Sequence, residues 1–330
     1  MTARELAALP KGHLHIHLEA AMRPATLRRL AAERDVALPA TTGFAGFTAF
    51  AAMYQGLLAV LGAPEDLALL VDEAVEDAAA DGAVYIEFGV SPQLYVDAFG
   101  SAAAALDAHL AAARAAGQTH GVEVGLMVTV DRTLGAEAAR ELARLAASRA
   151  GRGVVSLGLA NEERGHPAGE FAEAFAIAKA AGLQSAPHAG ELVGAESVRE
   201  AIEALDADRI LHGVRAIEDP ELVRLIAERG ICLDVCPTSN VLLDVVPDLS
   251  LHPLPRLLAA GVRCSINADD PILFGPGILD EYVAARDRIG LSDAQLADCA
   301  RSSIESTLAS EATKQRARAG IDAWLGKEGS

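Results

Sequence analysis

Cysteine, aromatic side chains and basic residues are all scarce in this chain of 330 residues. Its four cysteines, at positions 232, 236, 264 and 299, are too few and too irregularly spaced for a disulfide framework. The Cys232/Cys236 pair has no second pair beside it, which excludes a structural zinc knuckle. We therefore expect reduced thiols without a catalytic role, and a cytoplasmic location.

Long hydrophobic runs are absent as well. No stretch reaches the roughly 18 uncharged apolar residues of a membrane-spanning helix, and the N-terminus lacks the apolar core of a secretory signal. Lys and Arg total 28 against 46 Asp and Glu, a net charge of −18. So acidic a chain is a poor partner for nucleic acid or an anionic membrane. The hydrophobic content of 51% is that of a folded globular protein.

Short apolar runs alternate along the chain with helical patterns rich in Ala, Leu, Glu and Arg. The predicted strands cover residues 13–19, 83–90, 122–130, 154–160, 183–189, 209–214, 231–236 and 263–267. Several predicted helices end in a glycine just before the next strand, as at Gly117, Gly182 and Gly230. Eight βα units predict an α/β fold, a TIM (β/α)8 barrel. Because no change of composition marks a linker, we expect residues 1–330 to form a single hydrolase barrel domain, with extra helices after Leu291.

The connection over residues 20–82 is unusually long for a barrel. Within it Phe44, Phe47, Phe50 and Tyr54 recur at helical spacing. Such a helical insert either packs on the barrel rim or forms a lid over a site, since long insertions in compact domains often carry function.

The first predicted strand carries the sequence HLHIHLE. Because side chains alternate along a strand, His13, His15, His17 and Glu19 are expected on one face. Three imidazoles on one buried face need a cation or a strong polar network. The pair His15/His17 is therefore a predicted set of metal ligands.

Further polar side chains stand at the ends of later strands, where barrel enzymes keep their sites. His188 ends the fifth strand, and Glu191 follows as either another ligand or an acid/base catalyst. His212 ends the sixth strand, and taken alone it fits a core or a site position equally well. Asp269 and Asp270 end the eighth, where two adjacent buried carboxylates would be costly without a cation.

These strand ends should meet at one end of the barrel. Nitrogen-rich ligation with one carboxylate suits Zn²⁺ and leaves a coordination position for water. Water bound to zinc has a pKa of about 7, so the site would supply a hydrolytic nucleophile without serine or cysteine.

In their order along the chain, these motifs resemble the adenosine deaminase family of metal-dependent amidohydrolases. The resemblance spans nearly the whole chain, through LPKGHLHIHLEAAMRP near the start, SPQL at 91–94, HAGE at 188–191, LHG at 211–213, CPTSN at 236–240, HPL at 252–254 and NADDP at 267–271. It implies a hydrolase with one zinc ion per chain that acts on a small purine and releases ammonia. The zinc ligands implied by the resemblance are His15, His17, His188 and Asp269.

The resemblance also implies roles around the purine. Glu191 would protonate N1 as hydroxide attacks C6, and His212 would orient the attacking water. Asp270 would hydrogen-bond the N7 side. Glu19 stands where adenosine-specific members carry an Asp that meets the ribose, and Asn161 replaces a glycine whose backbone faces N3. The expected substrate is adenosine or 2′-deoxyadenosine; the alternative is adenine or a modified adenosine such as 6-aminodeoxyfutalosine.

Overall fold

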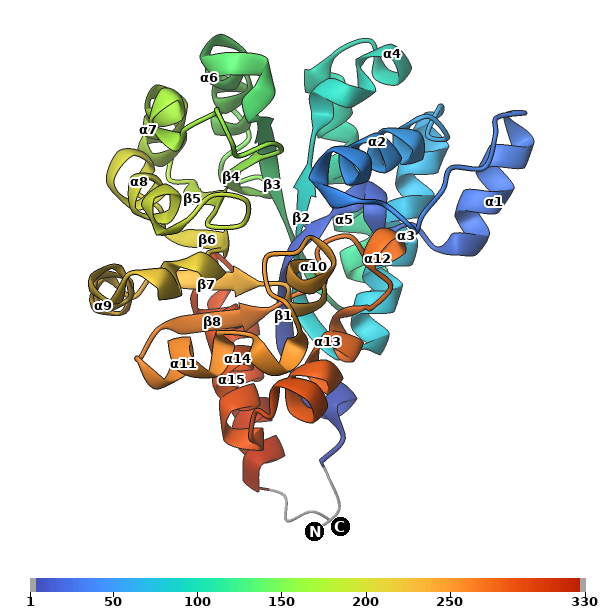
Figure 1. The fold of residues 1–330 in the computed structure, drawn as a ribbon. Helices are drawn as coiled ribbons and strands as arrows, with labels where there is room; N and C mark the ends of the chain where they lie inside the picture. The colour runs from blue at the N-terminus through green and yellow to red at the C-terminus, as the bar shows by residue number, and fades with distance from the viewer. Residues whose placement is uncertain (1–3, 327–330) are drawn as a thin grey trace.

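The computed structural model describes residues 4–326. Within this range eight strands form one sheet in sequential order, and every neighbouring pair is parallel (Figure 1). Residue Ile16 of the first strand also pairs with Asp269, beyond the last strand, so the sheet is nearly closed. The predicted TIM barrel is confirmed. The strands are β1 (Lys11–His17), β2 (Ala83–Val90), β3 (Glu123–Asp131), β4 (Val154–Ala160), β5 (Gln184–Ala189), β6 (Arg209–His212), β7 (Cys232–Val235) and β8 (Arg263–Ile266).

Helices surround the barrel because each buries one apolar stripe against the strands. In α6 the buried side chains are Ala139, Leu142, Ala143 and Ala146, which recur at the three-to-four-residue spacing of a helix face. The helices are α1 (Pro24–Glu33), α2 (Gly46–Leu58), α3 (Pro64–Ala80), α4 (Val96–Phe99), α5 (Ala102–His120), α6 (Gly135–Ala147), α7 (Ala172–Ala180), α8 (Ala195–Leu205), α9 (Pro220–Arg229), α10 (Pro237–Leu242), α11 (Leu254–Ala259), α12 (Pro271–Phe274), α13 (Ile278–Ala284), α14 (Asp293–Glu305) and α15 (Glu311–Gly326).

The first strand begins and ends two residues earlier than predicted, at Lys11 and His17. β1 ends at His17, and Leu18–Ala21 form a 3-10 turn in which the chain leaves the barrel. The expectation that Glu19 continues the strand face of the histidines is therefore wrong. The reason is that His17 makes the last ladder bond, from its N–H to the Asp269 carbonyl, before the long connection begins.

The connection that follows contains α1, α2 and α3. Helix α2 lies beside α12 at the carboxyl ends of the strands (Figure 1). The ring of Phe50 stacks on that of Phe274 with centroids 5.2 Å apart, and Phe44 meets Phe274 edge-on. These aromatic contacts hold α2 at the end of the barrel where the predicted site residues lie.

The last helices lie against the opposite end of the barrel, near the amino ends of the strands (Figure 1). The hydroxyl of Ser303 in α14 accepts a hydrogen bond of 2.7 Å from the Gly12 N–H at the start of β1. The side chain of Gln184, which begins β5, donates to the Ser306 carbonyl. Among the described residues, no helix combines the length and the apolar character that crossing a membrane requires.

Candidate active site

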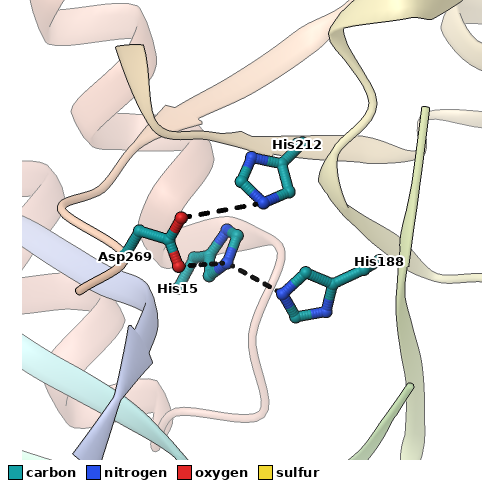
Figure 2. A group of neighbouring side chains, drawn as sticks. All are labelled: His15, His188, His212 and Asp269. Carbon is teal, nitrogen blue, oxygen red and sulfur yellow. Dashed lines mark hydrogen bonds and ion pairs between the residues drawn. The ribbon is translucent and has the colours of Figure 1, made fainter. Parts of the chain in front are cut away.

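Four buried polar side chains converge inside the barrel from the ends of β1, β5, β6 and the segment after β8. Their ligand-type atoms all lie within 4.8 Å of one another (Figure 2). The residues are His15, His188, His212 and Asp269. His17 joins them at the edge, with its Nε2 3.4 Å from Asp269 Oδ1 and its ring stacked on that of His188. Segments up to about 250 residues apart in sequence are therefore brought to one point, as β-barrel closure requires.

The hydrogen bonds of two histidines show which nitrogens face each other. Nδ1 of His15 lies 3.0 Å from the Asp234 carbonyl, and Nδ1 of His188 lies 2.9 Å from the Leu159 carbonyl. A carbonyl oxygen only accepts, so both Nδ1 atoms carry the proton. Burial and the neighbouring histidines hold the pKa of His188 well below its usual value, so this ring is neutral. Its Nε2 therefore presents a lone pair.

The Nε2 atoms of His15 and His188 are only 3.1 Å apart. Two ring nitrogens this close repel each other unless a proton or a cation lies between them. Asp269, whose Oδ2 accepts a 2.7 Å hydrogen bond from Ser239, adds an anionic ligand at the same point. This donor set fits a divalent metal ion. It contains His212 where the resemblance implies His17, and His17 falls in a second group of possible ligands with Asp269 and Asp270.

Three residues around this point hold a backbone conformation that non-glycine residues rarely adopt. The φ angles are +79° at Asn161, +62° at His212 and +61° at Asp269. Each stands where a strand gives way to its loop. Such strain persists only where the surrounding structure fixes it, and it is concentrated at functional sites. Here it directs the side chains of His212 and Asp269 toward those of His15 and His188.

Glu191 lies at the mouth of this cluster. Its Oε1 is 3.4 Å from His212 Nε2, and its side chain is buried. Burial, together with the charge of Asp269, holds the pKa of Glu191 well above the usual carboxyl value. A raised pKa favours the protonated carboxyl group, which is the form that can donate a proton to a bound molecule.

The loop that carries Glu191 is held by a second carboxylate. Glu163, itself buried, accepts hydrogen bonds from the N–H groups of Gly190 (2.8 Å), Leu192 (2.6 Å) and Val193 (2.8 Å). It also accepts one from the Ser197 hydroxyl. On the other side, the buried Arg132 donates to the His188 carbonyl at 2.7 Å. The segment between His188 and Val193 is therefore fixed at both ends, which the sequence did not reveal.

Asp270 and Asn161 complete the wall of the cavity beside the cluster. One oxygen of Asp270, Oδ1, is buried and has no hydrogen-bond partner within the described part of the chain, so it is available to a ligand. The Asn161 amide donates instead to Asp131 Oδ2 at 2.9 Å, and its Oδ1 accepts from the Glu162 N–H. Both ends of the Asn161 amide are thus engaged with the protein.

Glu19 lies behind two tyrosines. The hydroxyl of Tyr54 donates to Glu19 Oε2 at 2.5 Å, and that of Tyr95 donates to Oε1 at 2.7 Å. Tyr54, on α2, is part of the cavity wall, whereas Glu19 is not. Neither tyrosine was singled out as a partner of Glu19 from the sequence, because the contacts depend on how the insert folds back over β1.

The remaining cavity wall comes from α2 and from the loops after β2, β3 and β4. Phe47, Phe50 and Gln55 face the cavity from α2, and Leu94 and Thr129 from across it. Of the predicted site residues, His17, Asn161, His188, Glu191, His212, Asp269 and Asp270 all line this one cavity. His15 lies beneath it in the metal-ligand cluster, and only Glu19 is set apart.

Comparison with known proteins places this arrangement in context. Residues 10–324 match the family model described as adenosine deaminase. An adenine deaminase of Chelativorans sp. is 39% identical, over 93% of this chain and 96% of that protein. An aminodeoxyfutalosine deaminase of Acidothermus cellulolyticus is also 39% identical, over 88% of this chain and 86% of that protein.

Solved structures agree with the sequence relatives. The adenine deaminase of Arthrobacter aurescens superposes with a TM-score of 0.90 at 30% identity, covering 97% of this chain and all of that one. A zinc-bound amidohydrolase of Burkholderia ambifaria gives a TM-score of 0.86 at 27% identity, over 97% of this chain and 92% of that one. The chain belongs to the adenosine deaminase family and is a metal-dependent hydrolytic deaminase that acts on a C–N bond.

Proposed function

Starting from this family membership, we propose that the protein deaminates free adenine: adenine and water give hypoxanthine and ammonia. The sequence favoured adenosine or 2′-deoxyadenosine, with adenine or a modified adenosine such as 6-aminodeoxyfutalosine as the alternative. Relatives named adenine deaminase support the alternative. The geometry around Glu19 supports it independently.

The observation that carries the proposal is the hydrogen bonding of Glu19. In adenosine-specific members, as the resemblance implies, an acid at this position meets the ribose. Here each carboxylate oxygen of Glu19 already accepts a tyrosine hydroxyl, and the ring of Tyr54 forms the cavity wall in front of it. A ribose would have to displace Tyr54 and leave its buried hydroxyl unpaired, which costs about 1–3 kcal/mol. A free base needs no such displacement.

A divalent metal ion completes the site, and we propose that it is zinc. His15, His17, His188 and Asp269 would hold it, as the facing Nε2 atoms and the Asp269 carboxylate support. Bound there, zinc would supply hydroxide from water at neutral pH. The zinc-bound relative from Burkholderia ambifaria is consistent with this identity.

The residues of the chain then act on the purine. Protonated Glu191 donates its proton to N1, so that the ring can take up charge as C6 becomes tetrahedral. His212 faces the same point and orients the attacking water. The unpartnered oxygen of Asp270 hydrogen-bonds the N7 side, and the backbone of Asn161 meets N3.

The insert closes the site around the base. We propose that residues 20–82 act as a lid within a single barrel domain over residues 1–330, because Phe47, Phe50 and Tyr54 of α2 form one wall of the cavity. Their rings exclude water from the reacting carbon, which strengthens the hydrogen bonds made there.

A panel of substrates tests the proposal. Ammonia release is measured for adenine, adenosine, 2′-deoxyadenosine and 6-aminodeoxyfutalosine with the zinc-loaded protein, and kcat/KM is compared. We expect adenine to exceed adenosine by at least about 100-fold, the size of a discrimination of roughly 3 kcal/mol. A higher kcat/KM for either nucleoside would overturn the choice of adenine.

6-Aminodeoxyfutalosine is the second candidate, because one relative of 39% identity is named for that reaction. A 5′-substituted nucleoside would also have to pass the Tyr54 ring. The variants Tyr54→Phe and Tyr95→Phe help to distinguish the two candidate substrates, adenine and 6-aminodeoxyfutalosine. Each variant frees one carboxylate oxygen of Glu19 and should raise the ratio of nucleoside turnover to adenine turnover. If 6-aminodeoxyfutalosine is the best substrate of the wild-type protein, the second candidate replaces the first.

A further inference from the structure

The CPTSN and HPL motifs contribute two residues that do not line the cavity, Asn240 and His252. Both side chains are buried, and they form a chain of hydrogen bonds that ends on His212. We propose that Asn240 and His252 are positioning residues that hold the neutral ring of His212 with its proton on Nε2. This inference rests on the proposed function, since His212 orients the attacking water there.

The chain of hydrogen bonds begins at a backbone group. The N–H of Leu254 lies 3.1 Å from His252 Nδ1, and a backbone N–H can only donate. His252 Nδ1 therefore carries a lone pair. Burial lowers the pKa of His252 to about 4, so the ring is neutral at physiological pH and its single proton sits on Nε2.

The next step fixes the orientation of an amide. His252 Nε2 lies 3.2 Å from Asn240 Oδ1, so the Nε2 proton points to that oxygen. The opposite end of the amide, Nδ2, is then directed at His212 Nδ1, 3.1 Å away. Because an amide NH₂ can only donate, the Nδ1 of His212 accepts.

The last step sets the tautomer of His212. A ring nitrogen that accepts a hydrogen bond carries a lone pair, so the ring is neutral and holds a single proton. With Nδ1 accepting, that proton is on Nε2. The Nε2–H then faces Glu191 Oε1 at 3.4 Å and Asp269 Oδ2 at 3.8 Å, the space where the attacking water must lie.

This assignment divides the buried cluster into two kinds of group. His15 and His188 donate their Nδ1 protons to carbonyl oxygens, so Nε2 is the nitrogen left to bind a metal ion. His212 presents the proton on its Nε2, because its Nδ1 accepts the hydrogen bond from the Asn240 amide. Histidine thus serves as a proposed metal ligand at positions 15 and 188 and as a hydrogen-bond donor at position 212. The hydrogen-bond partner of Nδ1 determines which of these two roles the Nε2 atom can take.

Asn240→Asp is the variant that reverses the last step. Aspartate has nearly the shape of asparagine, still accepts the His252 proton, and presents an oxygen to His212 Nδ1 in place of NH₂. The proton of His212 should then move to Nδ1, leaving Nε2 as a lone pair. In a Ser-His-Asp triad, imposing the wrong tautomer on the histidine lowers kcat roughly 10⁴-fold. We expect kcat for adenine to fall by about 10³-fold or more, with a much smaller change in KM.

The tautomer itself is read by ¹⁵N NMR of the full-length, zinc-loaded protein labelled at histidine, recorded above pH 8 so that the rings are neutral. The wild-type signal of His212 should show a protonated Nε2 and a bare Nδ1, and Asn240→Asp should show the reverse. A wild-type His212 that carries its proton on Nδ1 overturns the inference. The inference is also overturned if the His212 tautomer is reversed in the Asn240→Asp protein while its kcat stays within about threefold of the wild-type value.

A second pair of variants covers the case in which Asn240→Asp fails to fold. His252→Leu removes the donor to Asn240, whereas His252→Gln restores an NH₂ donor at the same place. We expect mixed tautomers of His212 and a lower kcat in the first, and recovery of both in the second. Equal kcat and an unchanged His212 signal in the two variants would overturn the inference. If the wild-type protein releases no ammonia from any 6-aminopurine, the proposed function fails, and the NMR result alone still decides the tautomer.

Discussion

Glu163→Gln is the substitution whose effect follows most directly from the structure. The carboxylate accepts N–H groups at both oxygens: Gly190 at one, and Leu192 and Val193 at the other. Glutamine has one oxygen and one NH₂. Its better orientation keeps the oxygen on Leu192 and Val193 and turns the NH₂ toward Gly190 and Ser197. The Ser197 hydroxyl can rotate to accept from the NH₂, whereas the Gly190 N–H is left without an acceptor.

The magnitude can be worked from these contacts. One hydrogen bond to a charged group is lost and one buried donor is left unsatisfied, which together cost about 3 kcal/mol in the free energy of unfolding. The loop also carries Glu191, and a misplacement of a reacting group by about 1 Å lowers turnover by as much as 10²-fold. We expect kcat to fall roughly 10- to 100-fold with a small change in KM, as for other groups that orient site residues.

Three measurements and one matched variant check this. Urea unfolding gives the free energy, steady-state ammonia release gives kcat and KM, and amide hydrogen exchange of the peptide spanning residues 188–194 reports the loop. Glu200→Gln is the control, because the Glu200 carboxylate accepts the N–H groups of Ala168 and Gly169 at 3.1 Å, away from the cavity. It should lose stability without loss of kcat. Equal kcat in Glu163→Gln and Glu200→Gln would refute the reasoning.

Three further outcomes are expected. Glu191→Gln should keep its fold and metal content but lose about 10²- to 10⁴-fold in kcat, because the proton donor is removed; near-wild-type kcat would show that another group donates. His17→Ala should bind less metal by elemental assay, and full occupancy would exclude His17 as a ligand. Burial lowers the pKa of Lys11 to about 8 from 10.5. Between these pH values the unfolded chain binds the extra proton, so wild-type stability should rise with pH by about 3 kcal/mol relative to Lys11→Met. A pH-independent difference in urea unfolding would contradict this.

Much of the barrel was predictable because its signals are local. The predicted strands 83–90 and 154–160 coincide with β2 and β4, and the other predicted strands overlap observed ones. The convergence of His188, His212 and Asp269 was equally predictable. All three follow strands, and the carboxyl ends of the strands of a TIM barrel lie at one face. Glu19 was misplaced on the strand because the point at which β1 leaves the barrel depends on the Asp269 carbonyl, contributed by a distant segment.

The parts that could not be predicted are pairings across the barrel. The buried Arg209 lies between Glu87 and Asp234, which belong to β2 and β7. A buried charge is tolerated only when it is paired, but the sequence does not say which of 46 acidic residues supplies the pair. The carbonyl of the same Asp234 accepts the His15 Nδ1 proton. The protonation of His15, a proposed metal ligand, thus depends on a residue of β7 whose side chain takes part in an ion pair deep in the barrel. The chemistry of the HxH motif is therefore determined by the closed fold and not by the motif alone.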